Sequence, residues 1–425
     1  MAHRFDFASR LTERRLDNGL RAVLLPDCTR PLVTVNVWYH VGSKNERPGR
    51  TGFAHLFEHM LFQGSENVDT NDHFALIQQV GGVANGSTSF DRTNYYETLP
   101  SHCLELGLWL ESDRMGFLLP ALDGAKLANQ KDVVMNERRQ RVDNQPYGRA
   151  FETLHELLYP EGHPYSWPVI GYMDDIAATE VDEVHDFFRT HYRPGNSVLT
   201  LVGDFDVGEA LELVETYFGD LPDGALPPPA TAVDQPTSAK RHELHDDVSL
   251  PRLYLGFRGP RLTAPDFPAG DLYSLAVSGG KSSPLYRDLV LEREIAQDIY
   301  AGLLPLELES TVLVAMTLRP GVDPAPAERI LLDRLSGWQA EPPADTDFER
   351  ARNKASVGYL HEIESFESRA DLLSQFATYH DDPALIDTEL DRYARVEPAD
   401  LRAFARRYLE PERCVTLWVL PREAA

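Results

Sequence analysis

Two histidines four residues apart, with a glutamate directly before the second, could do metal chemistry: His55, Glu58 and His59. Side chains at positions i and i+4 of a helix share one face, with Cβ atoms about 5–6 Å apart, so both imidazoles can bind one ion. Glu58 can act on a water at that ion without being a ligand. The pattern predicts a hydrolytic Zn²⁺ site with Glu58 as catalytic base, and a chance pairing of two histidines is the alternative.

The residues around this pattern predict the helix that it needs. An apolar stripe at helical spacing runs beside the three polar residues and consists of Phe53, Leu56, Phe57, Met60 and Leu61. Thr51 and Gly52 precede the stripe and Gly64 follows it, which is typical of the start and the end of a helix.

A hydrolytic zinc site needs a third protein ligand, and Glu137 is the candidate. It lies in a second segment with helical spacing, which ends before Pro146 and places Gln130, Val134 and Glu137 on one face. Taken alone, Glu137 would be an ordinary solvated glutamate of a helix surface. Only together with the histidine motif does Glu137 become a candidate metal ligand.

The two motifs, HxxEH at residues 55–59 and VVxxE at residues 133–137, resemble the pitrilysin/insulinase family of zinc peptidases. The chain resembles the short, two-domain, processing-peptidase-like members, and segments along nearly all of it agree, among them 81–88, 163–165 and 192–196. The resemblance implies that His55, His59 and Glu137 bind Zn²⁺ and that Glu58 takes the proton of the attacking water.

The resemblance also implies how peptides bind. The strand that contains Asn85 and Ser87 is similar to the family segment whose backbone lines the cleft, where an extended peptide can add as a further strand. The neighbouring glycines could equally be plain turn glycines. Gln130 stands where many family members have a further glutamate, which implies a changed second shell around the zinc.

One departure from the family concerns a partner. Family members that act as complete units have an arginine and a tyrosine, seven residues apart, that grip the substrate, and Val290 and Gln297 stand at these positions here. A register shift of three residues would bring Arg293 and Tyr300 there instead. The resemblance therefore implies a homologous subunit that carries the pair in a heterodimer, with a homodimer as the alternative.

The chain length and a short internal repeat predict two domains. A chain of 425 residues is too long for one ordinary core. A helix-like segment at 188–192 followed by an apolar segment at 197–202 recurs at 404–408 and 414–419. A Pro-rich stretch separates the halves. We expect a zinc-binding catalytic domain over 1–222, a linker over 223–244, and a second, homologous, non-catalytic domain over 245–425.

The predicted fold class is α+β. Segments that read as strands, such as 32–39 and 252–257, are interleaved with amphipathic helices. Each domain should therefore have a mainly antiparallel sheet packed against helices on one face. The resemblance implies that the two domains together form a half-clamshell.

The composition excludes several classes of partner. There are 41 Lys and Arg against 67 Asp and Glu, which gives a net charge of −26 and makes nucleic acids and anionic membranes poor partners. No stretch approaches 18 apolar residues and residues 1–7 show no apolar signal segment, so we expect a soluble, cytoplasmic protein. The three cysteines are widely spaced and suit free thiols in a reducing compartment.

The sequence thus predicts a zinc metalloendopeptidase that hydrolyses unfolded peptides or oligopeptides inside a chamber closed by a second, similar subunit. Two alternatives remain open at this point. One is a non-catalytic scaffold that keeps the fold without the chemistry, and the other is a metal-binding subunit that does not hydrolyse peptides.

Overall fold

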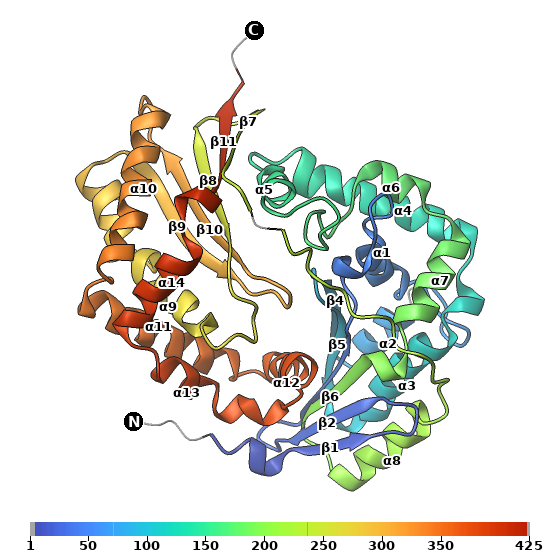
Figure 1. Ribbon diagram of the computed structural model, residues 1–425. Coiled ribbons are helices and arrows are strands. Elements are labelled where there is room, and N and C mark those ends of the chain that lie inside the picture. The colour runs from blue at the N-terminus through green and yellow to red at the C-terminus, as the bar shows by residue number, and fades with distance from the viewer. Residues whose placement is uncertain (1–4, 71, 236, 423–425) are drawn as a thin grey trace. The chain divides into compact units, whose positions relative to one another are not determined.

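A computed structural model describes residues 5–70, 72–235 and 237–422 (Figure 1). The chain divides into two compact units, and neither is contiguous in sequence. The first takes residues up to 138, 167–230 and 360–389, and the second takes 139–166, 231–359 and the residues from 390 on. Each unit therefore includes one segment from the other half of the chain. A single division of the chain at residues 223–244 does not describe these two exchanged segments.

The first unit is built on a six-stranded sheet with the order β1-β2-β6-β3-β5-β4. β2 and β6 pair in parallel, and all other neighbours are antiparallel. The strands are β1 (Thr12–Arg15), β2 (Arg21–Pro26), β3 (Leu32–Tyr39), β4 (Val83–Thr88), β5 (Thr93–Pro100) and β6 (Ser197–Gly203).

Alternation along β3 decides which helices cover which face of this sheet. Val33, Val35 and Val37 point into the main apolar core together with helices from the same half of the chain. These helices are α1 (Phe53–Met60), α2 (Asp72–Gln79), α3 (Leu104–Phe117), α4 (Gly124–Arg138), α6 (Met173–Ala178), α7 (Val181–His191) and α8 (Val207–Phe218). The other face is covered by α12 (Phe366–His380), which comes from the C-terminal half (Figure 1).

The face that α12 covers is unusually polar for a buried surface. Trp38 Nε1 donates to Asp371 Oδ1 at 2.8 Å, and Thr200 Oγ1 lies 2.8 Å from Ser374 Oγ. Both Thr200 and Ser374 are fully buried. Hydrogen bonds between the sheet and α12 therefore satisfy side chains that would otherwise be costly to bury.

The second unit repeats the design with one strand fewer. Its sheet has the order β7-β11-β8-β10-β9, with β7 and β11 parallel and the rest antiparallel, which matches β2-β6-β3-β5-β4 in order and direction. The strands are β7 (Lys240–Asp246), β8 (Arg252–Arg258), β9 (Ala296–Leu304), β10 (Thr311–Leu318) and β11 (Val415–Pro421). The α+β prediction is confirmed, and so are the two helix–turn–strand segments that repeat in the sequence.

One face of this second sheet packs against helices of the C-terminal half, and α5 (Ala150–Leu158) from the N-terminal half contacts β8 and β11. The C-terminal helices are α9 (Phe267–Ser278), α10 (Pro324–Ala340), α11 (Asp345–Glu362), α13 (Glu389–Ala394) and α14 (Pro398–Tyr408). Among the described residues, no helix has the length and apolar character needed to cross a bilayer.

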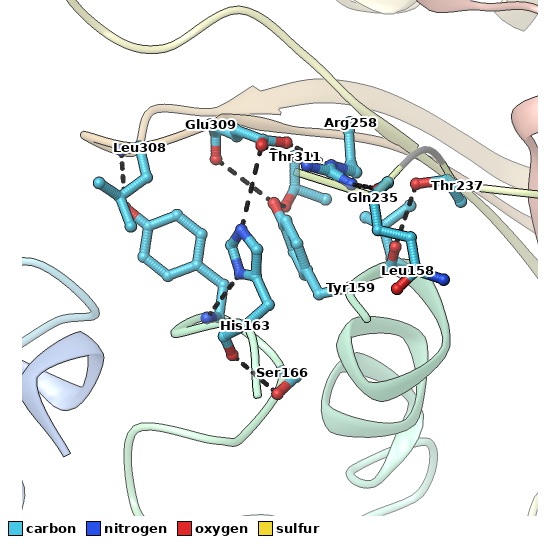
Figure 2. A network of polar contacts seen from close by, with 11 residues as sticks. Leu158, Tyr159, His163, Ser166, Gln235, Thr237, Arg258, Leu308, Glu309 and Thr311 are labelled. Carbon is cyan, nitrogen blue, oxygen red and sulfur yellow. Dashed lines mark hydrogen bonds and ion pairs between the residues drawn. The ribbon is translucent and has the colours of Figure 1, made fainter. Parts of the chain in front are cut away.

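A polar network fastens the segment after α5 to the second sheet (Figure 2). The Tyr159 hydroxyl lies 2.9 Å from Thr311 Oγ1, and Leu308 N donates to the Tyr165 hydroxyl at 2.9 Å. Glu309 forms an ion pair with Arg258 next to these bonds. Residues 139–166 are therefore attached to the sheet of the second unit by side-chain hydrogen bonds as well as by packing.

Candidate metal centre

Three metal-binding side chains predicted from the sequence converge in the first unit. His55 and His59 lie on α1, and Glu137 lies in the last turn of α4. Glu137 Oε2 is 3.2 Å from His59 Nε2 and 3.7 Å from His55 Nε2. One ligand atom from each residue lies within 4.8 Å of the others, and all three side chains are partly exposed. Two imidazole nitrogens and a carboxylate at this spacing fit the ligand set of a catalytic zinc ion.

Apolar packing fixes the direction of α1. The predicted stripe is buried: Phe57 is fully buried, and its ring stacks on Phe187 and Tyr192 with centroid distances of 5.4 and 5.0 Å. The Tyr95 hydroxyl donates to the carbonyl of Phe57 at 3.2 Å. The polar stripe with both histidines therefore faces away from the core at a fixed angle.

The end of α4 is attached close to the start of α1. Arg138, the residue after Glu137, donates from Nη1 to the carbonyl of Gly171 at 2.9 Å. Gly171 in turn touches the start of α1, where a Cβ on residue 171 would lie 2.4 Å from Gly52 Cα. Only glycine permits this approach. The two helices that supply the ligands are thereby connected next to the site.

Glu58 lies beside the three candidate ligands and is half-buried. Burial raises the pKa of its carboxyl, while a hydrogen bond with Thr88 and the nearby His59 lower it. A carboxylate whose pKa is raised toward neutral pH is a better proton acceptor at that pH. Glu58 is therefore placed to handle a proton next to the metal centre.

Strand β4 forms an edge of the first sheet and runs past Glu58. Gly86 and Thr88 face Glu58, whereas Asn85 and Ser87 alternate with them and point to the opposite side. Ser87 Oγ donates to Asn94 Oδ1 at 2.7 Å. Asn85 and Ser87 therefore turn their side chains away from Glu58, and their role in binding a peptide through the backbone stays a prediction.

Of the other residues predicted from the sequence, Gln130 belongs to the first unit, and Val290, Gln297 and Arg293 belong to the second. Gln130 is buried on α4, two turns before Glu137, and its second-shell role stays a prediction. Val290 is buried among apolar side chains of the second unit, and Gln297 is exposed on β9. Arg293 Nε donates to Asp288 Oδ1 at 2.9 Å.

Sequence reasoning missed three residues around α1. Thr88 and Gly86 were missed because small or polar residues occur on both faces of β4. No pattern in the sequence therefore identified the face of this strand that lies next to Glu58. Thr51 does not cap α1, since its hydroxyl donates to Asp175 Oδ2 at 2.7 Å. The first amides of the helix are instead bound by Glu46, and a glutamate nine residues before His55 gave no signal by itself.

Comparison with known proteins identifies the family. A model described as "Insulinase (Peptidase family M16)" matches residues 21–167, and one described as "Peptidase M16 inactive domain" matches 179–355. The chain belongs to peptidase family M16. The predicted resemblance to the pitrilysin/insulinase family is thereby confirmed.

Individual relatives extend the likeness over most of the chain. The zinc protease PqqE of Helicobacter pylori is 28% identical over 411 residues, which are 96% of this chain and 92% of that protein. A crystal structure of a protease from Helicobacter pylori has a TM-score of 0.90 and 27% identity, and covers 97% of this chain and 99% of that one. The mitochondrial-processing peptidase subunit beta of Blastocladiella emersonii is 28% identical over 50% of this chain and 44% of its own.

Proposed function

We propose that this M16 protein is a zinc-dependent endopeptidase that hydrolyses unfolded peptides. The observation that carries the proposal is the convergence of His55, His59 and Glu137 within 4.8 Å, with Glu58 beside them on the same helix as the histidines. A zinc protease from Helicobacter pylori that is similar over nearly the whole chain supports the same chemistry.

The residues have separate roles in this proposal. His55, His59 and Glu137 hold the zinc ion, which when bound supplies Lewis-acid chemistry and lowers the pKa of a water molecule. Glu58 accepts the proton of the attacking water and later delivers it to the leaving amine. The free edge of β4 binds the peptide backbone as an added strand, which makes binding largely independent of the peptide sequence.

We further propose that a second, homologous subunit completes the site. Val290 is buried and apolar, so it cannot bind the carbonyl groups of a peptide. Arg293 is engaged in an ion pair with Asp288, which speaks against its use in a shifted register. One relative is named as a subunit of a processing peptidase. A closed chamber formed with such a partner would exclude water and align the peptide against Glu58.

Zinc content and peptide cleavage test the first proposal. The purified chain should contain about one zinc per chain, because three ligands with one open position are typical of catalytic zinc sites. Together with a homologous partner it should cleave a quenched fluorescent peptide in a manner abolished by a chelator. A chain that binds zinc but cleaves no peptide with any homologous partner would be a metal-binding subunit, and one that binds no zinc would be a scaffold.

Activity of the lone chain tests the partner. We expect a low kcat/KM for the chain alone and a large gain on adding a homologous chain that carries the arginine and the tyrosine. Full activity of the homogeneous protein that is lost in Arg293→Ala or Tyr300→Phe would contradict the heterodimer and favour a self-sufficient homodimer.

A further inference from the structure

The zinc helix α1 begins without a cap from its own sequence. Its N-cap is Gly52, which has a left-handed conformation with φ of 87° and no side chain, and the first turn contains no acidic residue. The first amides of a helix have no partner within the helix and need one from elsewhere. In α1 these amides lie directly before His55.

The carboxylate of Glu46 supplies this missing partner. Its Oε2 accepts a hydrogen bond from Gly52 N at 2.9 Å, and its Oε1 accepts one from Ala54 N at 2.8 Å. Both oxygens act as acceptors, which is what the ionised carboxylate provides and a neutral amide cannot. Burial raises the pKa of Glu46 well above its ordinary value, and the backbone donors offset only part of this rise.

We infer that Glu46 is a positioning residue of the metal centre, which holds the first turn of α1 and so directs His55 toward Glu137. The inference rests on the proposed zinc site and deepens it. α1 has only eight residues, and a helix this short does not hold its shape by itself. Its first turn therefore depends on bonds from other segments, and Glu46 makes two of them next to the ligand.

The electrostatics of the helix support the same role. The N-terminus of a helix carries a partial positive charge, which is unfavourable near a bound dication. His55 is the third residue of α1, so the zinc ion would be close to this end. A carboxylate at the first amides offsets the positive charge. Glu46 should therefore raise the affinity for zinc through geometry, and in its ionised form also through charge.

The loop that carries Glu46 is itself firmly held. Lys44 Nζ donates to the carbonyl of Asp91 at 2.9 Å, and both of these side chains are buried. Trp167 Nε1 donates to the carbonyl of Ser43 at 2.8 Å. Arg47 and Arg50, the two arginines that follow Glu46 in the chain, both pair with Glu183, at 3.8 and 2.6 Å. The carboxylate of Glu46 thus reaches α1 from a fixed support.

Zinc affinity of the purified full chain tests this inference. In Glu46→Gln one of the two amides faces an NH₂ group, and we expect zinc to bind about 10- to 100-fold more weakly, the usual effect of losing a support of a metal ligand. Glu46→Asp keeps the charge on a shorter side chain and should restore part of the affinity. Asp182→Asn removes one exposed carboxylate from the neighbouring helix α7 and serves as the matched control, with affinity unchanged.

The dissociation constant is measured by competition with a chelating dye, and thermal unfolding of the metal-free variants is recorded in parallel. A purely structural role predicts a lower melting temperature of metal-free Glu46→Gln with zinc affinity unchanged, which would overturn the inference. If Glu46→Gln does not fold, an unchanged zinc affinity in Glu46→Asp overturns it instead. If the wild-type chain does not bind zinc, the proposed function itself is refuted. If the wild type binds zinc and His59→Ala loses it, the proposed site holds, and an unchanged affinity in the Glu46 variants then overturns only the role of Glu46.

Discussion

Gly86 and Glu58 lie so close that a Cβ on residue 86 would be 3.2 Å from Cγ of Glu58. The edge strand β4 therefore passes the candidate catalytic base at contact distance, without a side chain between them. A peptide that adds to β4 would run next to the same carboxylate. The absence of a side chain at residue 86 is thus part of the geometry of the site.

Gly86→Ala should reduce peptide cleavage while leaving the zinc bound. The new methyl group would also lie 3.2 Å from Tyr95 Cδ1, so Glu58 or the strand must shift by a few tenths of an ångström. Such a displacement of a catalytic group should cost about tenfold in kcat/KM. Gly358→Ala is the control, because no atom lies within 4 Å of the added Cβ and the residue belongs to the second unit. Equal activity of both variants would contradict this prediction.

Glu58→Gln should keep zinc and lose activity. The substitution removes the proton acceptor but none of the three candidate ligands, so kcat should fall by at least about 10²-fold. Metal analysis and peptide cleavage of the same preparation decide the matter. Loss of zinc would assign Glu58 a ligand role, and retained turnover would remove it from the mechanism.

Glu137→Ala and His59→Ala should both lose zinc, because a site reduced from three ligands to two no longer holds the ion tightly. Zinc is quantified after dialysis against a weak chelator. Asp132→Ala, at an exposed position on the same helix α4, is the control and should retain zinc. A metal-replete Glu137→Ala variant would show that the third ligand lies elsewhere.

A buried carboxyl pair predicts a pH dependence of stability. Glu97 on β5 and Glu111 on α3 are both fully buried, and one guanidinium, from Arg114, pairs with Glu111. Burial, together with the charge of Glu111, raises the pKa of Glu97 well above its ordinary value. The folded protein therefore keeps a proton on Glu97 that the unfolded chain releases at a pKa of about 4.3. The contribution of this protonated carboxyl to the free energy of unfolding is complete below that pH and is lost as the pH rises above it.

Glu97→Gln mimics the protonated acid and should remove this loss. The variant should unfold at higher urea concentration than the wild type at pH 8, and the difference should shrink as the pH approaches about 4.5. Urea unfolding of the metal-free proteins across this range measures it. A destabilisation that is the same at every pH would show that Glu97 is ionised in the folded state.

The sequence was sufficient for the parts of the site that lie on helices. The apolar stripe that includes Phe53 and Phe57 has one period and one buried face, so both the helix and the side of it that carries His55 could be predicted. Strand β4 was different, because its two faces are both polar or small. The side that meets Glu58 is decided by tertiary packing, and the period of two alone cannot reveal it.

The covering of the sheets could not be predicted for a related reason. Thr34 and Asn36 alternate with valines on β3, a pattern typical of one solvated face, yet both are buried. Residues more than 300 positions later in the chain cover them, as the bond from Trp38 to Asp371 illustrates. Local patterns contain no information on such distant contacts.

The exchange of α5 and α12 between the halves has a consequence for how the chain acquires its structure during synthesis. The strands of the first sheet are complete once residue 203 has emerged from the ribosome, but the helix that covers their second face ends at residue 380. Until then Trp38 and Thr200 lack the partners that α12 provides. Folding of the N-terminal half should therefore finish only after residue 380 has been synthesised, and an N-terminal fragment should be prone to aggregate.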